Sequence, residues 1–297
     1  MAAGSNAFYS QQYASAVELL SQQMQPLVAS TFTQMSAVGK SATVVNQIAA
    51  FEADERSTLY DPVVFGTPTH NRPWVYPRFF DKALPFDSIE QMQMNANPTS
   101  EYVRGVVAAL NRRMDDEAIR AFFADRLLGE SAGTTDSFAA GFQVSVDTGG
   151  TGSGLNVEKV QNALQILREQ EVDTQMERIY CVIAPKQERN LMNEIEVTSS
   201  DFTAKRIIDS GTLAGSNFMG INWIVSNRLL IDGSSYRRVP FYSTSGMAFA
   251  TWDGGVKTDI SQRKDLRGHP WQVYGSGNFG AVRRDALKVV EIKCSEA

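Results

Sequence analysis

The chain has 297 residues, 43% of them hydrophobic, and its 28 Lys and Arg against 33 Asp and Glu give a formal charge of −5. This length allows one large or two modest domains. A protein that grips nucleic acid tightly usually carries a basic excess, so the acidic balance argues against that class of function.

The side chains that metal sites and nucleophilic catalysis need most are scarce in this sequence. Cys181 and Cys294 lie in apolar runs, and they are predicted to be buried strand thiols in a reducing compartment, without a disulfide. His70 and His269 have no Cys or second His close in sequence, so we predict polar surface or interface residues. We therefore expect no catalytic residues, no metal and no cofactor.

Targeting and membrane-spanning segments are not expected either. The first residues have no basic start followed by an apolar core, which argues against a secretory signal. No run of 18 apolar residues occurs, so no transmembrane helix is predicted.

Residues 1–50 are rich in Gln, Ser and Ala and predict an arm with little core of its own. A loosely amphipathic helix is expected over residues 8–25, ended by Pro26. The sequence Gly39-Lys40-Ser41 invites comparison with a phosphate-binding loop, but that motif needs a glycine where Gln34 stands. A turn is the preferred interpretation.

Residues 51–98 hold six of the ten prolines and a dense mixture of aromatic and basic side chains. Proline at this density excludes helix and central strand and leaves extended, edge-type strands. The segment is too aromatic for a solvated linker, so its rings are expected to bury against the body of the chain or a neighbouring subunit. A single-stranded nucleic-acid platform is disfavoured by proline rigidity and nearby acidic residues. The interface candidates are Arg72, Trp74, Tyr76, Arg78, Phe79 and Phe80.

Residues 99–129 predict the clearest helix, about 45 Å long at roughly 1.5 Å per residue. Thr99 or Ser100 is expected to cap it, and Gly129 to stop it. Asp116 and Arg120 are predicted to form an i,i+4 pair. The run 115–117 of three carboxylates suggests an acid/base pair, but successive helix positions point in different directions. We therefore predict a solvated face.

The Gly/Ser/Thr-rich residues 130–155 predict a mobile loop and a domain boundary, because the glycine cluster lacks the spacing of a dinucleotide-binding loop. An α/β pattern follows. Its expected elements are a helix over 157–170 capped by Asn156, a buried strand over 178–184, a helix opened by Pro185, a polar loop over 197–204 and a strand over 221–225.

The remaining residues predict strands over 247–252, 256–260 and 289–294, with a turn-rich stretch over 268–280. In the last strand, Val290, Ile292 and Cys294 share one face, while Glu291 and Lys293 lie on the other.

The order of these segments resembles the major capsid proteins of tailed bacteriophages, of the Hong Kong ninety-seven type. The resemblance of layout covers nearly the whole chain, and none of its local patterns is a catalytic signature. Those patterns are Phe8-Tyr9-Ser10-Gln11-Gln12-Tyr13 with Leu19-Leu20-Ser21-Gln22-Gln23, Arg72-Pro73-Trp74-Val75-Tyr76-Pro77-Arg78 with Asp87, and Asn97-Pro98-Thr99-Ser100-Glu101-Tyr102 with Asn111-Arg112-Arg113-Met114-Asp115-Asp116.

The resemblance implies an α+β phage capsid fold with an N-terminal arm, an extended β-hairpin loop, a long spine helix, an α/β axial domain and a peripheral β-sheet domain. The expected parts are the arm 1–50, the extended loop 51–98, the peripheral domain with its spine helix 99–155, the axial domain 156–245 and the peripheral strands 246–297. The axial loop would present Thr198, Ser199, Ser200 and Asp201 near the five-fold and six-fold axes.

The implied function is a major capsid protein that self-assembles into pentamers and hexamers of an icosahedral head enclosing double-stranded DNA. The implied partners are other copies of the chain, a portal and packaged DNA that is bound without sequence specificity. No contact with a membrane is implied. A separate scaffolding protein is expected because no long charged helical segment precedes the arm. The location would be the virion, after assembly in the host cytoplasm. The isopeptide cross-link of the type member is not carried over, because no motif selects a partner for Lys82.

Three alternatives stay open on the sequence. One is an encapsulin-like nanocompartment shell protein of the same fold, one is an enzyme of unidentified type, and one is another virion or fibre protein. Cargo binding in a small shell would indicate the first, and an activity of the assembled particles the second.

Overall fold

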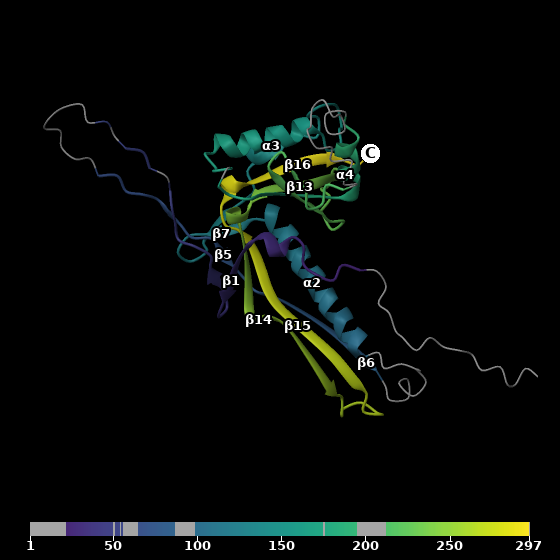
Figure 1. Ribbon diagram of the computed structural model, residues 1–297. Helices are drawn as coiled ribbons and strands as arrows, with labels where there is room; N and C mark the ends of the chain where they lie inside the picture. The colour runs from purple at the N-terminus through teal and green to yellow at the C-terminus, as the bar shows by residue number, and fades with distance from the viewer. Residues whose placement is uncertain are drawn as a thin grey trace, which may run out of the picture. The chain divides into compact units, whose positions relative to one another are not determined.

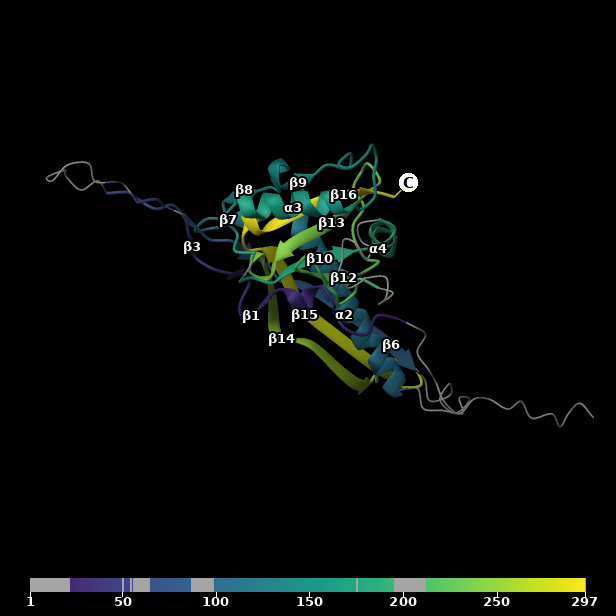
Figure 2. The same ribbon diagram turned by 45° about the horizontal axis from the view of Figure 1, so that its top comes forward.

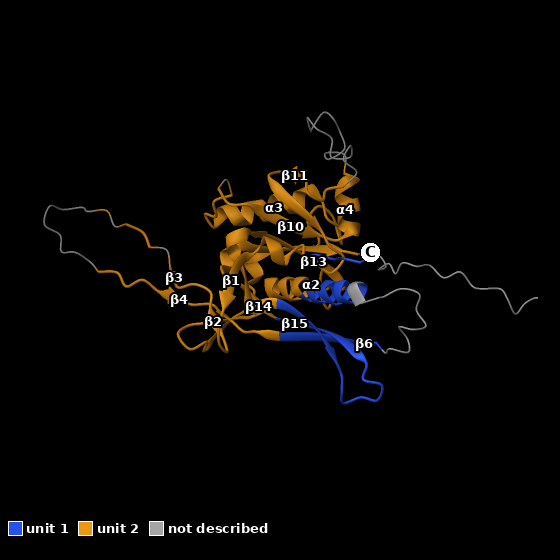
Figure 3. Cartoon of the chain, turned by 60° about the horizontal axis from the view of Figure 1, so that its bottom comes forward, with its two compact units in different colours: residues 1–25, 79–113, 256–277 blue, residues 26–78, 114–255, 278–297 orange. Residues whose placement is uncertain are grey.

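The structure is a computed structural model that describes residues 22–49, 51–53, 55, 65–86, 99–174, 176–194 and 212–296 (Figure 1). The chain forms two compact units (Figure 3). The first comprises residues 1–25, 79–113 and 256–277, and the second comprises residues 26–78, 114–255 and 278–297. The division into arm, loop, axial and peripheral parts stays a prediction.

The second unit is built around a six-stranded mixed sheet in the order β11-β12-β10-β13-β16-β9. Helix α3 packs against β16 and β9 of this sheet (Figure 2). The strands are β9 (Gln143–Val144), β10 (Ile179–Ile183), β11 (Asn217–Phe218), β12 (Ile221–Val225), β13 (Tyr236–Ser243) and β16 (Val289–Ser295), and the helices are α3 (Val157–Glu169) and α4 (Pro185–Met192).

Most predictions for this sheet are confirmed. Asn156 caps α3 by accepting a hydrogen bond from the Lys159 amide, and Pro185 opens α4. Cys181 and Cys294 are free, buried thiols on β10 and β16. The alternation predicted for β16 is incomplete, because Glu291 is as fully buried as the apolar face.

Residues 130–155 contain more structure than the predicted loop. They form the short strands β8 (Thr134–Asp136) and β9, and the glycine-rich end is tied to helix α3. The ammonium of Lys159, which is fully buried, donates to the carbonyls of Ser153, Gly154 and Lys293 at 2.8, 2.9 and 3.0 Å. Burial lowers the pKa of Lys159. The glycine-rich end therefore provides turns and also two backbone acceptors, the carbonyls of Ser153 and Gly154, for a buried cation.

A second sheet has the order β1-β14-β15-β6, with β1 (Thr33–Ala37), β14 (Met247–Gln262), β15 (Trp271–Arg283) and β6 (Arg78–Phe86). The predicted break between two strands in 247–260 is wrong, because β14 passes through it. Gly254 and Gly255 adopt φ values of +81° and +84° within this strand, a backbone conformation that glycine adopts without strain. The turn-rich prediction for 268–280 is also wrong, since β15 occupies most of it.

The glycines of β15 allow close packing within each unit. A Cβ on Gly275 would lie 2.4 Å from Val106 Cγ1, in the first unit's core around Phe86, Leu110 and Val273. A Cβ on Gly280 would lie 2.4 Å from the carbonyl oxygen of Tyr76 in the second unit. Glycines in a sequence can indicate either a turn or a place where other atoms pack too closely for a Cβ. In β15 the glycines serve close packing.

We expect Gly280→Ala to lower the free energy of unfolding by about 1–3 kcal/mol, the usual cost of overpacking. The added methyl meets backbone, which cannot rotate away as a side chain would. Chemical denaturation of unassembled subunits measures the change. Gly141→Ala is the control, because its Cβ meets nothing within 4 Å. Equal stability of the two variants would contradict the expected clash.

Helix α2 (Thr99–Phe123) is shorter than the predicted 99–129. Arg126–Leu128 instead form β7, which pairs with β5 (Trp74–Val75) and β8 in a sheet of order β2-β5-β7-β8, where β2 is Ala42–Thr43. The side chains of the expected caps, Thr99 and Ser100, lie outside the described residues. Gly129 adopts a φ of +96°, but it follows the strand rather than the helix.

The described part of the proline-rich segment contributes strands to three sheets. Strand β6, which contains Pro85, lies at a sheet edge as predicted, but β5 is internal because it occupies the proline-free step between Pro73 and Pro77. Ahead of it, β3 (Gln47–Ile48) pairs with β4 (His70–Asn71) in a hairpin that extends away from the sheets of the second unit (Figure 1).

Candidate functional site

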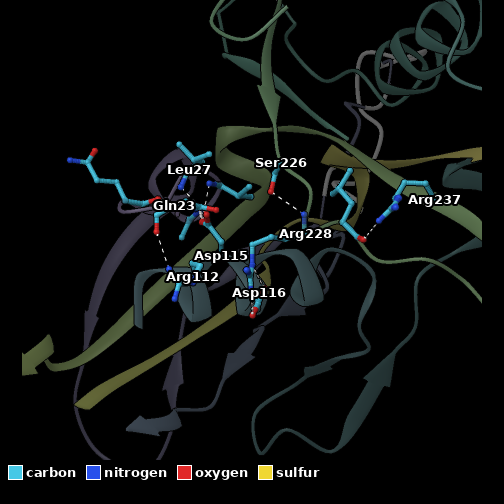
Figure 4. A network of polar contacts seen from close by, with 12 residues as sticks. Gln23, Leu27, Arg112, Asp115, Asp116, Ser226, Arg228 and Arg237 are labelled. Carbon is cyan, nitrogen blue, oxygen red and sulfur yellow. Dashed lines mark hydrogen bonds and ion pairs between the residues drawn. The ribbon is translucent and has the colours of Figure 1, made fainter. Parts of the chain in front are cut away.

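Asp115, at the middle of helix α2, binds the backbone of the N-terminal segment. Its carboxylate is fully buried and accepts hydrogen bonds from the amides of Leu27, Val28 and Ala29 at 2.9, 3.0 and 3.0 Å (Figure 4). Residues 29–31 then form a 3₁₀ turn, η2. The predicted solvated face is wrong for Asp115, because the segment that covers it lies 86–88 positions away in sequence.

Within the first unit, the preceding turn of α2 binds the residues just before this segment. Asn111 donates to the carbonyl of Met24 at 2.8 Å, and Arg112 donates to Gln22 Oε1 at 2.6 Å and to the carbonyl of Gln23 at 3.3 Å. Most of these contacts are to backbone, so Asn111 and Arg112 hold residues 22–24 largely independently of their side chains. In the second unit, Asp115 does the same for residues 27–29, and we call Asp115 the arm clamp.

The two carboxylates after Asp115 have separate partners. Asp116 forms a two-pronged ion pair with Arg228 at 2.5 and 2.6 Å, and not the predicted pair with Arg120 (Figure 4). Glu117, also buried, accepts from Arg78 at 2.8 Å and from Arg120 at 2.5 Å. The three carboxylates do not converge on one point, as predicted. Asp115 and Glu117 are buried rather than solvated, and Asp116 is partly exposed in its ion pair.

A hollow of about 390 Å³ lies in the second unit, where β5, the end of α2 and β15 meet. We call it the arginine hollow, because Arg78, Arg120, Arg126 and Arg283 line it together with only two carboxylates, those of Glu117 and Asp125. The rest of its lining is Trp74, Val75, Tyr76, Ala121, Ala124, Leu127, Ala281 and Val282.

The structure separates the six predicted interface residues into two groups. Trp74 donates to the carbonyl of Gly129 at 2.7 Å, and Phe80 packs in the first unit's core, so both serve the chain's own fold. Arg72 donates to Asn46 and Arg78 to Glu117. Tyr76 and Phe79 are exposed, at 41% and 73%.

The remaining predictions concern the axial loop, the two histidines, metal binding and membrane-spanning helices. Thr198, Ser199, Ser200 and Asp201 lie outside the described residues. His70 and His269 are exposed, and His269 adopts a φ of +47°. No cluster of His, Cys, Asp and Glu in the described part of the chain could hold a metal ion. Among the described residues, no helix combines the length and hydropathy that crossing a bilayer requires.

The predicted extended loop includes the outer part of the hairpin, but its apolar residues Phe51 and Phe65 were not among the predicted interface candidates. Phe51 and Phe65 are 82% and 90% exposed there, in a hairpin that begins before the predicted extended loop, at Gln47. In the sequence, each is an apolar residue within a polar stretch. Only its exposure in the structure indicates a surface that could contact a partner.

The described residues combine exposed aromatic side chains with an N-terminal segment that is held on helix α2 by buried hydrogen bonds. The family model described as "Phage capsid protein" matches residues 5–296, so the chain belongs to the phage capsid protein family. It is a shell protein of the virion capsid, where its copies associate with one another.

Solved structures agree with this fold. The chain is similar to Mycobacterium phage Che8, with a TM-score of 0.73 at 13% identity over 97% of each chain. For the capsid of cyanophage P-SCSP1u the TM-score is 0.75 at 11% identity, covering 100% of this chain and 96% of that one. The capsid of cyanophage Pam1 gives 0.75 at 10% identity, covering 99% and 98%. No curated protein matches the chain in sequence.

Proposed function

We propose that the chain is the major capsid protein of a tailed bacteriophage and builds pentamers and hexamers of an icosahedral head around double-stranded DNA. The match of the phage capsid family to residues 5–296 carries the proposal. Its role is structural rather than enzymatic. Its further partners are a portal and a separate scaffolding protein, and assembly takes place in the host cytoplasm.

The exposed apolar side chains support assembly as the role. Tyr76 and Phe79 are exposed in the proline-rich segment, and Phe51 and Phe65 are exposed on the hairpin. Obligate interfaces bury on the order of 2,000–5,000 Å² and are rich in aromatic residues. Contact with a neighbouring subunit would remove these rings from water.

The acidic composition fits a shell that encloses DNA without holding it, since the formal charge of the chain is −5. Contacts to packaged DNA would then be weak and independent of base sequence.

Overexpression followed by negative-stain microscopy tests the proposal directly. Polyhedral shells or rings of capsomers are the expected result. A monodisperse monomer at high concentration would contradict it, and shells that carry a protein cargo in their native host would favour a cellular compartment.

We expect Tyr76→Ala combined with Phe79→Ala to reduce the yield of shells about tenfold or more, because a loss of about 1.4 kcal/mol per contact already changes an association constant tenfold. The thermal unfolding midpoint of the unassembled subunit should change little, since both rings are exposed. Trp74→Ala and Phe80→Ala are less specific, because those rings also stabilise the chain itself.

Leu287→Ala is the matched control, because this leucine is also exposed but lies in the 3₁₀ turn η6 (Ala286–Lys288), away from the proline-rich segment. Normal shells from the double variant would remove Tyr76 and Phe79 from the interface.

A further inference from the structure

The arginine hollow gathers more positive charge than its own lining balances. Its four arginines face the carboxylates of Glu117 and Asp125 only, which leaves an excess of two positive charges. Asp136, which does not line the hollow, pairs with Arg126 and reduces the excess to one. The chain as a whole has a formal charge of −5, so this concentration of cations is local and does not follow from the composition.

Two of the four arginines present accessible guanidinium groups that are already held together. Glu117 Oε2 accepts from Arg78 Nη1 at 2.8 Å and from Arg120 Nε at 3.1 Å. The side chains of Arg78 and Arg120 nevertheless stay 50% and 47% exposed. Guanidinium groups bind phosphate and carboxylate groups through parallel N–H donors. Because one buried carboxylate positions both, a ligand would have little ordering of side chains left to offset.

Arg283 gives an independent indication that the hollow favours an anion. It is 1% exposed, and its Nε has no hydrogen-bond partner among the described residues. Burial, and then the neighbouring Arg126, lower the pKa of Arg283 to about 10. Negative charge in the hollow would stabilise this buried cation without touching it, because charges interact over several ångströms where water is excluded.

The volume and the rest of the lining select a class of anion. The hollow measures about 390 Å³, within the range of about 300–1,000 Å³ that small-molecule sites occupy. A phosphate monoester carries about −1.5 to −2 charges near pH 7, which matches an excess of one to two positive charges. The ring of Tyr76, 41% exposed in the lining, offers a larger ligand a surface for stacking.

We propose that the arginine hollow binds the phosphoryl group of a small phosphorylated molecule between Arg78 and Arg120. Inorganic phosphate and nucleoside monophosphates share this chemistry. Either ligand would bridge Arg78, at the start of β6, and Arg120, on α2, and would thereby stabilise the subunit. The site needs no second copy of the chain, so it does not depend on the proposed function in shell assembly.

Isothermal titration calorimetry of the full-length, unassembled subunit tests the site. The probes are inorganic phosphate, adenosine 5′-monophosphate and adenosine, with KCl keeping the ionic strength constant. Phosphate should bind with a Kd of about 0.1–1 mM. Equal affinities for phosphate and the monophosphate would identify inorganic phosphate as the ligand, and tighter binding of the monophosphate would identify a nucleoside phosphate. Either result supports the phosphoryl site, whereas adenosine binding as tightly as its monophosphate would overturn it.

Two substitutions should change phosphate binding in opposite directions. Arg120→Gln should weaken it about tenfold, the effect of roughly 1.4 kcal/mol. Asp125→Asn should tighten it about threefold, because it removes an exposed carboxylate from the lining without removing an arginine. Arg104→Gln is the matched control and should bind phosphate as the unmodified chain does. Arg104 also pairs with a glutamate three positions earlier on α2, but it does not line the hollow.

Three results would contradict the proposal. The first is no binding of phosphate beyond the effect of KCl. The second is unchanged or weaker binding by Asp125→Asn, a variant whose exposed position should leave the fold intact. The third is a short DNA duplex that binds through Arg120 while phosphate and the monophosphate do not, which would make the hollow a contact for nucleic acid. Assembly of the chain into shells is scored separately by microscopy, so failure of the anion site leaves the proposed function standing.

Discussion

Replacing Asp115 with alanine should lower the free energy of unfolding of the unassembled subunit by about 3–5 kcal/mol. The carboxylate is the acceptor for the amides of Leu27, Val28 and Ala29, and those of Val28 and Ala29 are buried. A buried donor that loses its acceptor costs about 1–3 kcal/mol, because water cannot replace the acceptor. Denaturant titration of the subunit measures the loss.

The same substitution should release residues 26–29 from helix α2, which limited proteolysis can detect as new cleavage in that segment. Asp116→Ala is the matched control on the next helix position. It removes the same charge, but its partner Arg228 and Asp116 itself are both partly exposed, so the expected loss is only about 1 kcal/mol. If both variants lose the same free energy of unfolding, the buried hydrogen bonds of Asp115 stabilise the subunit no more than an exposed ion pair does.

The local elements of the α/β region could be predicted because each has a signal within its own residues. Asn156 and Pro185 mark helix starts, and the mostly apolar sequence of 221–225 predicts β12. Such signals reflect the local backbone conformation and the pattern of buried side chains. Residues close in sequence largely determine both.

The contacts of Asp115 and Glu117 could not be predicted in the same way. Three adjacent carboxylates on a helix are usually solvated, and only the return of residues 22–29 and of Arg78 to α2 makes them structural. Apart from Arg120, which pairs with Glu117 three positions away, their partners lie tens of residues away in sequence. The periodicity of the helix sequence does not indicate which distant segments of the chain will pack against the helix.

The long strands β14 and β15 were missed for a related reason. Glycine is common in turns, but Gly275 and Gly280 lie where helix α2 and the backbone at Tyr76 come too close for a Cβ. The arginine hollow depends on the same approach, since its lining comes from β5, α2, β7 and β15. A site assembled from four separate segments leaves no motif in any one of them.

Replacing Arg238 with methionine should lower the free energy of unfolding by about 3–5 kcal/mol. Arg238 on β13 donates to both carboxylate oxygens of Glu291 on the neighbouring strand β16, and Glu291 is fully buried. The guanidinium also lies 4.2 Å from the ring centre of Phe123. Without Arg238, the buried carboxylate of Glu291 loses this ion pair while its charge remains in the six-stranded sheet.

Removing both charges should cost less than removing Arg238 alone. In Arg238→Met with Glu291→Leu, no charge is left buried, and apolar side chains of similar size occupy the two positions. The double variant should therefore recover part of the lost stability, measured by denaturant titration of the unassembled subunits. Arg263→Met is the control, since its ion pair with Asp265 is exposed and should have no measurable effect on unfolding. If the double variant proves less stable than Arg238→Met, Glu291 stabilises the sheet through contacts other than its charge pair, and the electrostatic account of this position is wrong.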